Sequence, residues 1–151
     1  EMIPYSGMAT THDVGDLVAI HPSNKKAVAD RLSYLALEND YGLDYIDAKA
    51  PFPVKYEFKK NHVIVTFDAG KMGLGPIHTE LEGFEMAGPD RQFYPAVGKV
   101  LGEPRNSIIV FNCPEVTNVV AVRYGMKNYS KATLFNNFGI PVTPFRSDDW
   151  K

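Results

Sequence analysis

Hydrophobic positions in residues 24–39 recur every three to four residues, which is the spacing of one face of an α-helix. The apolar face consists of Val28, Leu32, Leu35 and Ala36. The polar positions expected to face solvent include Lys25, Asp30 and Glu38. Ser23 or Asn24 can cap the start by accepting a backbone N–H bond, and Gly42 can end the helix in a left-handed conformation. The pattern therefore predicts one helix, preceded by a turn-rich loop through residue 20.

After Gly42 the pattern changes to short alternating segments, which are typical of β-strands. A proline-punctuated connector at residues 50–53 comes first, and the alternation is clearest in residues 62–68. The expected strands are residues 55–58, 62–68, 81–87, 93–101, 107–112, 119–124 and 133–135. Turn residues such as Gly88-Pro89-Asp90 separate them. This number of short strands predicts an antiparallel β-sandwich.

The change of pattern predicts a domain boundary near residues 45–52. Residues 1–48 would form a helical segment and residues 49–151 the β-sandwich. The apolar stripe of such a helix ordinarily covers a parallel sheet, which this sequence does not predict. We therefore expect another stretch of polypeptide, in cis or as a separate chain, to supply that sheet. The start at Glu1 instead of an initiator methionine fits a segment of a longer protein.

Composition narrows the classes of function. The chain is 44% hydrophobic and 23% charged, which is close to the globular average. Its net charge of -2, from 16 basic and 18 acidic residues, lacks the basic excess of a nucleic-acid-binding protein. The sequence has no apolar run near the roughly 20 residues that span a bilayer. We expect neither nucleic acid nor a membrane as a partner.

His21, just before the predicted helix, is the residue with the clearest candidate chemistry. Because Pro22 disfavours a helical conformation at the residue before it, we expect the imidazole on an extended segment at the edge of the fold. The positive end of the helix dipole would favour a neutral ring, which can accept a proton from a hydroxyl nucleophile. Asp13 or Asp16 could accept the other ring N–H and fix the tautomer. A plain capping loop is the alternative interpretation.

Other candidate residues predict little chemistry. His62 and His78 lack the paired spacing of a zinc site, so we expect no metal. The glycine-rich residues 70–75 lack the spacing of a phosphate-binding loop, so we expect no cofactor there but a mobile loop that could flank a substrate. Five aromatic side chains could stack on a sugar, although filling the core is the more common role. They are Tyr94, Tyr124, Phe135, Phe145 and Trp150.

A series of segments resembles, in order, the C-terminal part of the sialate O-acetylesterases, which belong to the SGNH (GDSL-type) hydrolase superfamily. The first segments are residues 7–16, residues 20–26 with the run Ile-His-Pro-Ser-Asn-Lys-Lys, and residues 28–32. The later segments are residues 81–88, 93–96, 114–116, 121–124 and 139–148. Together they extend over most of the chain.

The resemblance implies a mainly β chain, in which a C-terminal antiparallel β-sandwich follows the last loop and helix of an α/β SGNH-hydrolase domain. It also implies a serine nucleophile, a histidine general base and hydrolysis of O-acetyl esters on sugars through an acyl-enzyme. His21 matches the family histidine. Members often have an acidic residue two positions earlier, where this chain has Ala19. Asp16 is our first substitute for that orienting carboxylate.

The family's nucleophile block has no match in this sequence. Ser6-Gly7 and Ser23-Asn24 are the nearest similar pairs, and neither stands in a strand-to-helix turn. The resemblance therefore predicts the C-terminal portion of a carbohydrate O-acetylesterase, of the sialate 9-O-acetylesterase kind, that supplies His21 to a serine outside this chain. By itself the chain would not be a complete enzyme.

The expected partners are the N-terminal portion of the same enzyme and an O-acetylated sugar, without a cofactor. By resemblance, the enzyme would be secreted or periplasmic. The alternative is a non-catalytic β-sandwich module that binds carbohydrate or supports a neighbouring domain, with its helix docked on the sandwich.

Overall fold

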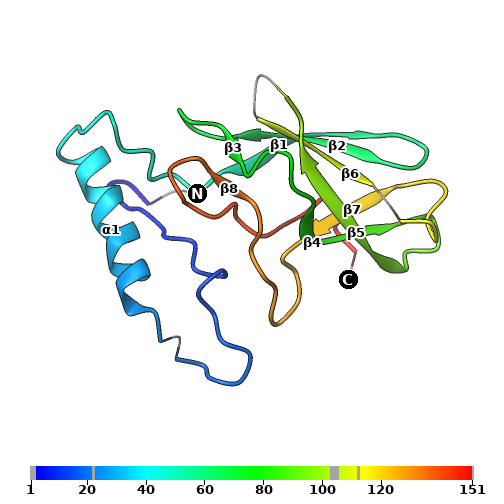
Figure 1. Ribbon diagram of the computed structural model, residues 1–151, viewed down its shortest axis with the longest axis horizontal. Helices are drawn as coiled ribbons and strands as arrows, with labels where there is room; N and C mark the ends of the chain where they lie inside the picture. The colour runs from blue at the N-terminus through cyan, green and yellow to red at the C-terminus, as the bar shows by residue number, and fades with distance from the viewer. Residues whose placement is uncertain (1–2, 22, 103–105, 112, 151) are drawn as a thin grey trace.

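The computed structural model describes residues 3–21, 23–102, 106–111 and 113–150. One helix, α1 (Lys25–Asn39), lies beside a β-rich body (Figure 1). The strands are β1 (Phe52–Phe58), β2 (Val63–Asp68), β3 (Leu74–Gly75), β4 (Leu81–Ala87), β5 (Phe93–Val100), β6 (Ser107–Phe111), β7 (Ala121–Tyr124), β8 (Phe135–Asn136) and β9 (Phe145–Arg146). The prediction of a mainly β, antiparallel fold is confirmed.

The main sheet curls until its two edges approach each other. It has seven strands in the order β1-β2-β6-β5-β4-β7-β9, while β3 and β8 pair separately. At the edges, the ring of Tyr56 on β1 lies 6.2 Å from that of Phe145 on β9. Thr143, just before β9, donates its backbone N–H to the carbonyl of Pro51, just before β1, over 3.0 Å. The apolar interior thus lies within a sheet that nearly closes on itself.

Alternation along the strands fills this interior. Val63, Val65 and Phe67 on β2 are buried, as the sequence pattern predicts, while the residues between them are more exposed. The fully buried Tyr124 on β7 completes the core, with its ring centroid 4.6 Å from that of Phe84. Its hydroxyl accepts the backbone N–H groups of the two residues before β8, over 3.0 and 3.1 Å. A buried tyrosine needs such partners for its polar end.

Two of the strands within the described residues have no counterpart in the sequence pattern. β3 and β9 contain two residues each, which is too short for an alternation to be visible. β1 also begins earlier than expected, at Phe52, because a shift of register between Pro53 and Lys55 accommodates the proline. Asn112, the expected end of β6, lies outside the described residues.

Helix α1 begins where the sequence predicts. The side chain of Asn24 accepts the backbone N–H of Ala27 over 3.1 Å, which is an N-cap bond. Its buried face differs from the apolar stripe, however: Leu32 is 51% exposed, whereas Arg31 is 8% exposed. The reason is an ion pair, since the Arg31 guanidinium bonds both carboxylate oxygens of Asp13 over 2.6 and 2.5 Å.

The Arg31 guanidinium also donates to the carbonyl of Thr10 over 2.8 Å. Paired with a carboxylate and a carbonyl, the charge is satisfied inside the protein, which permits its burial. The loop before α1 is therefore fastened to the middle of the helix.

The helix in turn contacts the β-rich body. The ring of Tyr34 lies edge-on to that of Phe138, with centroids 5.2 Å apart. Glu38, expected in solvent, bonds Lys71 of the body over 2.8 Å. The domain boundary predicted between residues 48 and 49 falls in the connector that follows α1, and it stays a prediction.

Candidate functional site

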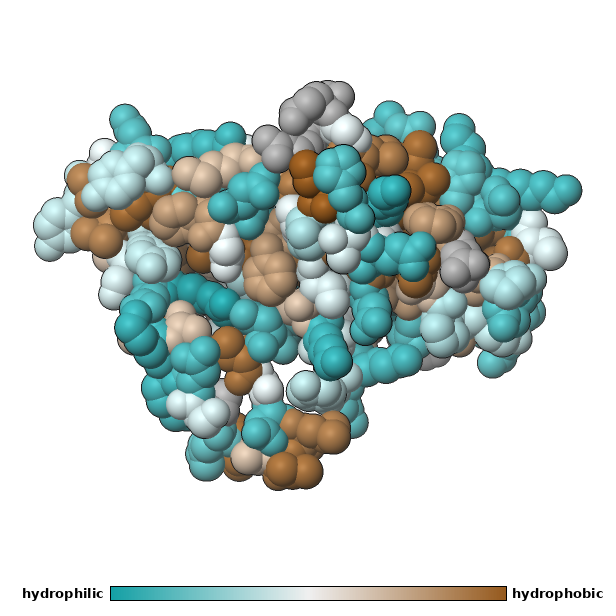
Figure 2. All heavy atoms as spheres, in the orientation of Figure 1, coloured by the Kyte–Doolittle hydropathy of each residue, from teal (hydrophilic) through white to brown (hydrophobic). Residues whose placement is uncertain are grey.

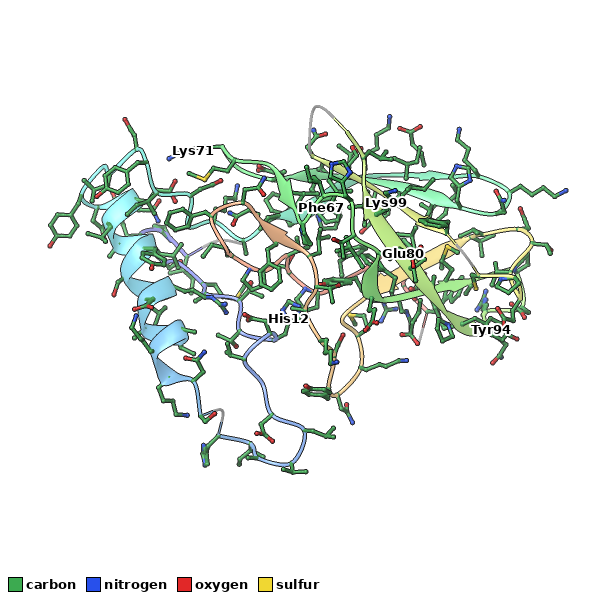
Figure 3. The ribbon with its side chains drawn as sticks, viewed as in Figure 1. His12, Phe67, Lys71, Glu80, Tyr94 and Lys99 are labelled. Carbon is green, nitrogen blue, oxygen red and sulfur yellow. The ribbon has the colours of Figure 1, made fainter. Side chains whose placement is uncertain are left out.

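His21 is exposed on the loop that precedes α1. Figure 3 shows this loop extending away from the sheet before the chain turns into the helix. Pro22, from which we expected an extended conformation at His21, lies outside the described residues. The imidazole is open to another molecule, and the described part of the chain provides it with no hydrogen-bond partner.

Asp16 organises the turn that leads to His21. Its Oδ1 accepts the backbone N–H groups of Val18 and Ala19, over 2.9 and 3.1 Å. These hydrogen bonds lower the pKa of the Asp16 carboxyl below its ordinary value. The carboxylate is therefore ionised at neutral pH, with one oxygen engaged by the loop.

Asp13, the other carboxylate considered for His21, is engaged elsewhere. Both of its oxygens bond the guanidinium of Arg31. Within the described residues neither Asp13 nor Asp16 bonds to His21. The second oxygen of Asp16, Oδ2, has no hydrogen bond to the described chain and is free to accept one from an imidazole. The orienting role of Asp16 therefore stays a prediction.

Large apolar side chains precede His21 on the same loop. Leu17, Val18 and Ile20 are 73%, 91% and 89% exposed. Figure 2 shows apolar residues at the tip of this loop. Such clustering on an exposed surface is typical of contact with another molecule.

His12 is a half-buried histidine that the sequence analysis did not single out. Both of its ring nitrogens are buried without a hydrogen-bond partner among the described residues. The ring stands edge-on to Tyr124, with centroids 5.9 Å apart, and points toward the β-rich body in Figure 3. Burial lowers the pKa of His12, against the opposing effect of Asp13 and together with the nearby Arg31. The sequence around His12 gives no sign of its burial, because the residues that cover it lie far away in the chain.

The remaining candidates have structural positions. His62 bonds the side chain of Asn61 at the β1–β2 turn, and His78 is exposed between β3 and β4. Tyr124 and Phe145 are core residues, whereas Trp150 packs near the surface against Phe93, with ring centroids 5.6 Å apart.

The described residues hold no group of three His, Cys, Asp or Glu side chains placed to bind a metal ion. Their one helix is neither long nor apolar enough to cross a bilayer. Of the two serines nearest to the family pattern, Ser6 bonds the carbonyl of Ile3 and Ser23 is exposed. In the described chain, neither serine bonds to His21.

The burial of both ring nitrogens of His12 predicts a pH-dependent stability. Because its pKa in the folded state lies below the ordinary 6.5, the unfolded chain takes up the proton first as the pH falls. The stabilisation is complete above about pH 6.5 and is lost as the pH falls toward the lowered pKa. We expect the midpoint of urea unfolding to fall between about pH 7 and pH 5, and to fall less in His12→Phe. A His62→Gln control should keep the parent's dependence of the urea midpoint on pH. The same dependence in His12→Phe would show that His12 is not its source.

Comparison of the sequence with protein-family models and with curated proteins found no match. Among solved structures, the chain is similar to a carbohydrate acetylesterase from Xanthomonas citri, with a TM-score of 0.80 and 33% sequence identity. The similarity covers 91% of this chain and 31% of that protein. The chain thus spans about a third of the enzyme it matches. This likeness relates the mainly β fold and its helix to one part of a carbohydrate esterase.

Proposed function

We propose that this chain is the C-terminal portion of a carbohydrate O-acetylesterase, in which His21 is the general base for a serine carried by another part of the enzyme. The observation that carries the proposal is the 33% identity to a carbohydrate acetylesterase over 91% of this chain. The remainder of that enzyme is more than twice as long as the matched part, so it has ample room for a nucleophile.

The proposed chemistry needs a neutral, accessible imidazole. His21 would take the proton of the serine hydroxyl as its oxygen attacks the acetyl carbonyl, and would then return a proton to the departing sugar oxygen. Water, deprotonated by the same ring, would hydrolyse the acetyl-enzyme and release acetate. The exposed position of His21 supports this role, because the ring can reach a hydroxyl on a neighbouring polypeptide.

The apolar side chains beside His21 support a polypeptide partner. We propose that Leu17, Val18 and Ile20 are covered by the serine-bearing portion, an α/β domain of the SGNH type, joined in cis or as a separate chain. Covering them would remove apolar surface from water at the same place where the imidazole meets the nucleophile. The substrate proposed at this junction is an O-acetylated sugar, and the resemblance to the sialate O-acetylesterases makes an O-acetylated sialic acid the first candidate.

A chimera tests the role of His21. In this chimera the present chain replaces the matching third of the Xanthomonas citri enzyme, and hydrolysis of an aryl acetate is measured. We expect His21→Ala to lower kcat/KM by several orders of magnitude, because the serine loses its base. His62→Ala, which removes the histidine at the β1–β2 turn, is the matched control. Equal rates for the two variants would reject the catalytic role and favour a non-catalytic module.

Asp16 is tested in the same chimera by Asp16→Asn. The amide oxygen can still accept the N–H groups of Val18 and Ala19, so the turn is retained while the negative charge is lost. If the carboxylate orients and stabilises the imidazolium, we expect kcat to fall by about 10²- to 10⁴-fold. Asp90→Asn is the control, since Asp90 bonds the N–H of Gln92 in a similar turn of the β-rich body. Full activity of Asp16→Asn would restrict Asp16 to forming the turn.

A further inference from the structure

We propose that the β-rich body fixes the direction of α1 through a clamp centred on Lys71, which makes Lys71 a positioning residue for the loop that carries His21. The Lys71 clamp comprises Glu38, residues 44–48 and residues 70–72. It joins the last turn of the helix, the connector after it and the segment between β2 and β3. In Figure 3, Lys71 lies on the side of the body toward the C-terminal end of α1.

The Lys71 ammonium group is fully used within this clamp. Its nitrogen lies 2.8 Å from Oε1 of Glu38, 3.2 Å from the carbonyl oxygen of Asp44 and 2.9 Å from that of Ile46. An ammonium group has three N–H donors, so each has a partner. The hydrogen bond to Glu38 raises the pKa of Lys71 above its ordinary value, so the charged form is favoured further. A lysine that simply extends into solvent would not meet a carboxylate and two carbonyls from the same junction.

Asp47 adds a second set of hydrogen bonds between the connector and the segment that carries Lys71. Asp47 is buried, with 1% of its surface exposed. Its Oδ2 accepts the backbone N–H groups of Lys71 and Met72, each over 3.0 Å. Its carbonyl accepts from the side chain of Asn136 over 3.0 Å. The connector therefore supplies carbonyls to the lysine side chain and a carboxylate to the lysine backbone. Charge-assisted bonds of this kind are stronger than neutral ones.

Gly70 permits this close approach. Its φ is +67°, a conformation that glycine adopts without strain, and a Cβ at this position would collide with the carboxylate of Asp47. The glycine-rich residues 70–75, expected from sequence to be a mobile loop, are instead tied to the connector. The side chain of Asn137 adds a bond of 2.7 Å to the carbonyl of Met72.

Glu38 is the residue of α1 that binds both other parts of the clamp. While its Oε1 bonds Lys71, its Oε2 accepts the backbone N–H of Ala48 over 2.9 Å. The contact between Tyr34 and Phe138, one turn earlier on α1, is a second point of attachment. Two points of attachment along the helix define its direction relative to the body.

The direction of α1 matters because His21 lies beyond its other end. A helix of 15 residues is about 22 Å long, so a tilt of about 10° at the clamp moves the far end by roughly 4 Å. Catalysis is lost with displacements much smaller than this. The catalytic consequence of the clamp rests on the proposed function, whereas the clamp as a device that fixes the helix does not.

The geometric test uses the full chain. Spin labels are placed at Ser33 on α1 and Lys99 on β5, each replaced by cysteine in a Cys113→Ala background, and the distance distribution is measured by double electron–electron resonance. We expect Lys71→Met, which keeps the length of the side chain but removes its donors, to broaden or shift the distribution by several ångströms. Lys55→Met is the matched control, because Lys55 pairs with Glu57 on β1 outside the clamp.

An unchanged distribution in a folded Lys71→Met variant would overturn the proposal. Should Lys71→Met fail to fold, Glu38→Ala is used instead, since it removes the ion pair and leaves the bonds of Lys71 to the connector carbonyls. Glu38→Ala is expected to broaden the distribution as well, and a distribution identical to the parent's would again overturn the proposal.

The catalytic test uses the chimera. We expect Lys71→Met to lower kcat by at least about 10²-fold with a smaller change in KM, because the base is misplaced while the substrate pocket is retained. Lys55→Met should leave both constants unchanged. If His21→Ala is active, the proposed function fails while the distance measurement still decides the clamp. If His21→Ala is inactive but Lys71→Met matches Lys55→Met, only the positioning role fails.

Discussion

The buried ion pair between Arg31 and Asp13 is the interaction on which the arrangement of the candidate site depends. It joins the loop to the middle of α1, and Asn24 joins the end of the same loop to the start of the helix. The loop that carries His21 is thus anchored to the helix through Asp13 and again through Asn24, which limits the conformations open to it. His21 owes its exposed but restrained position to this closure.

The β-rich body supplies the second frame. Its core is complete without the helix, yet it contacts the helical segment at three places. Lys71 bonds Glu38, and the ring of Phe138 packs against that of Tyr34. The ring of Tyr124 packs against that of His12. These contacts connect the candidate base to a rigid scaffold. Under the proposed function, a body that holds α1 would account for a mainly β unit beside the active site, without any requirement that it bind sugar itself.

Local features were predictable from the sequence, and long-range pairings were not. The cap at Asn24 and the alternation of Val63, Val65 and Phe67 depend on neighbours within a few residues, so the structure agrees with them. The burial of Arg31 depends on a carboxylate 18 residues away, which is why the helix face differs from the apolar stripe. Curling of the sheet, the two-residue strands and the burial of His12 likewise depend on segments far apart in the chain.

The central claim is that the Arg31–Asp13 pair holds the His21 loop on the helix, and denaturant unfolding of the full chain tests it most directly. The two side chains are 9% and 13% exposed, so Arg31→Met leaves a poorly solvated carboxylate without its partner. The account predicts a loss of about 3 kcal/mol in the free energy of unfolding. Lys26→Met, which breaks the solvent-exposed pair with Asp30, should cost much less. Equal losses for the two variants would contradict the account.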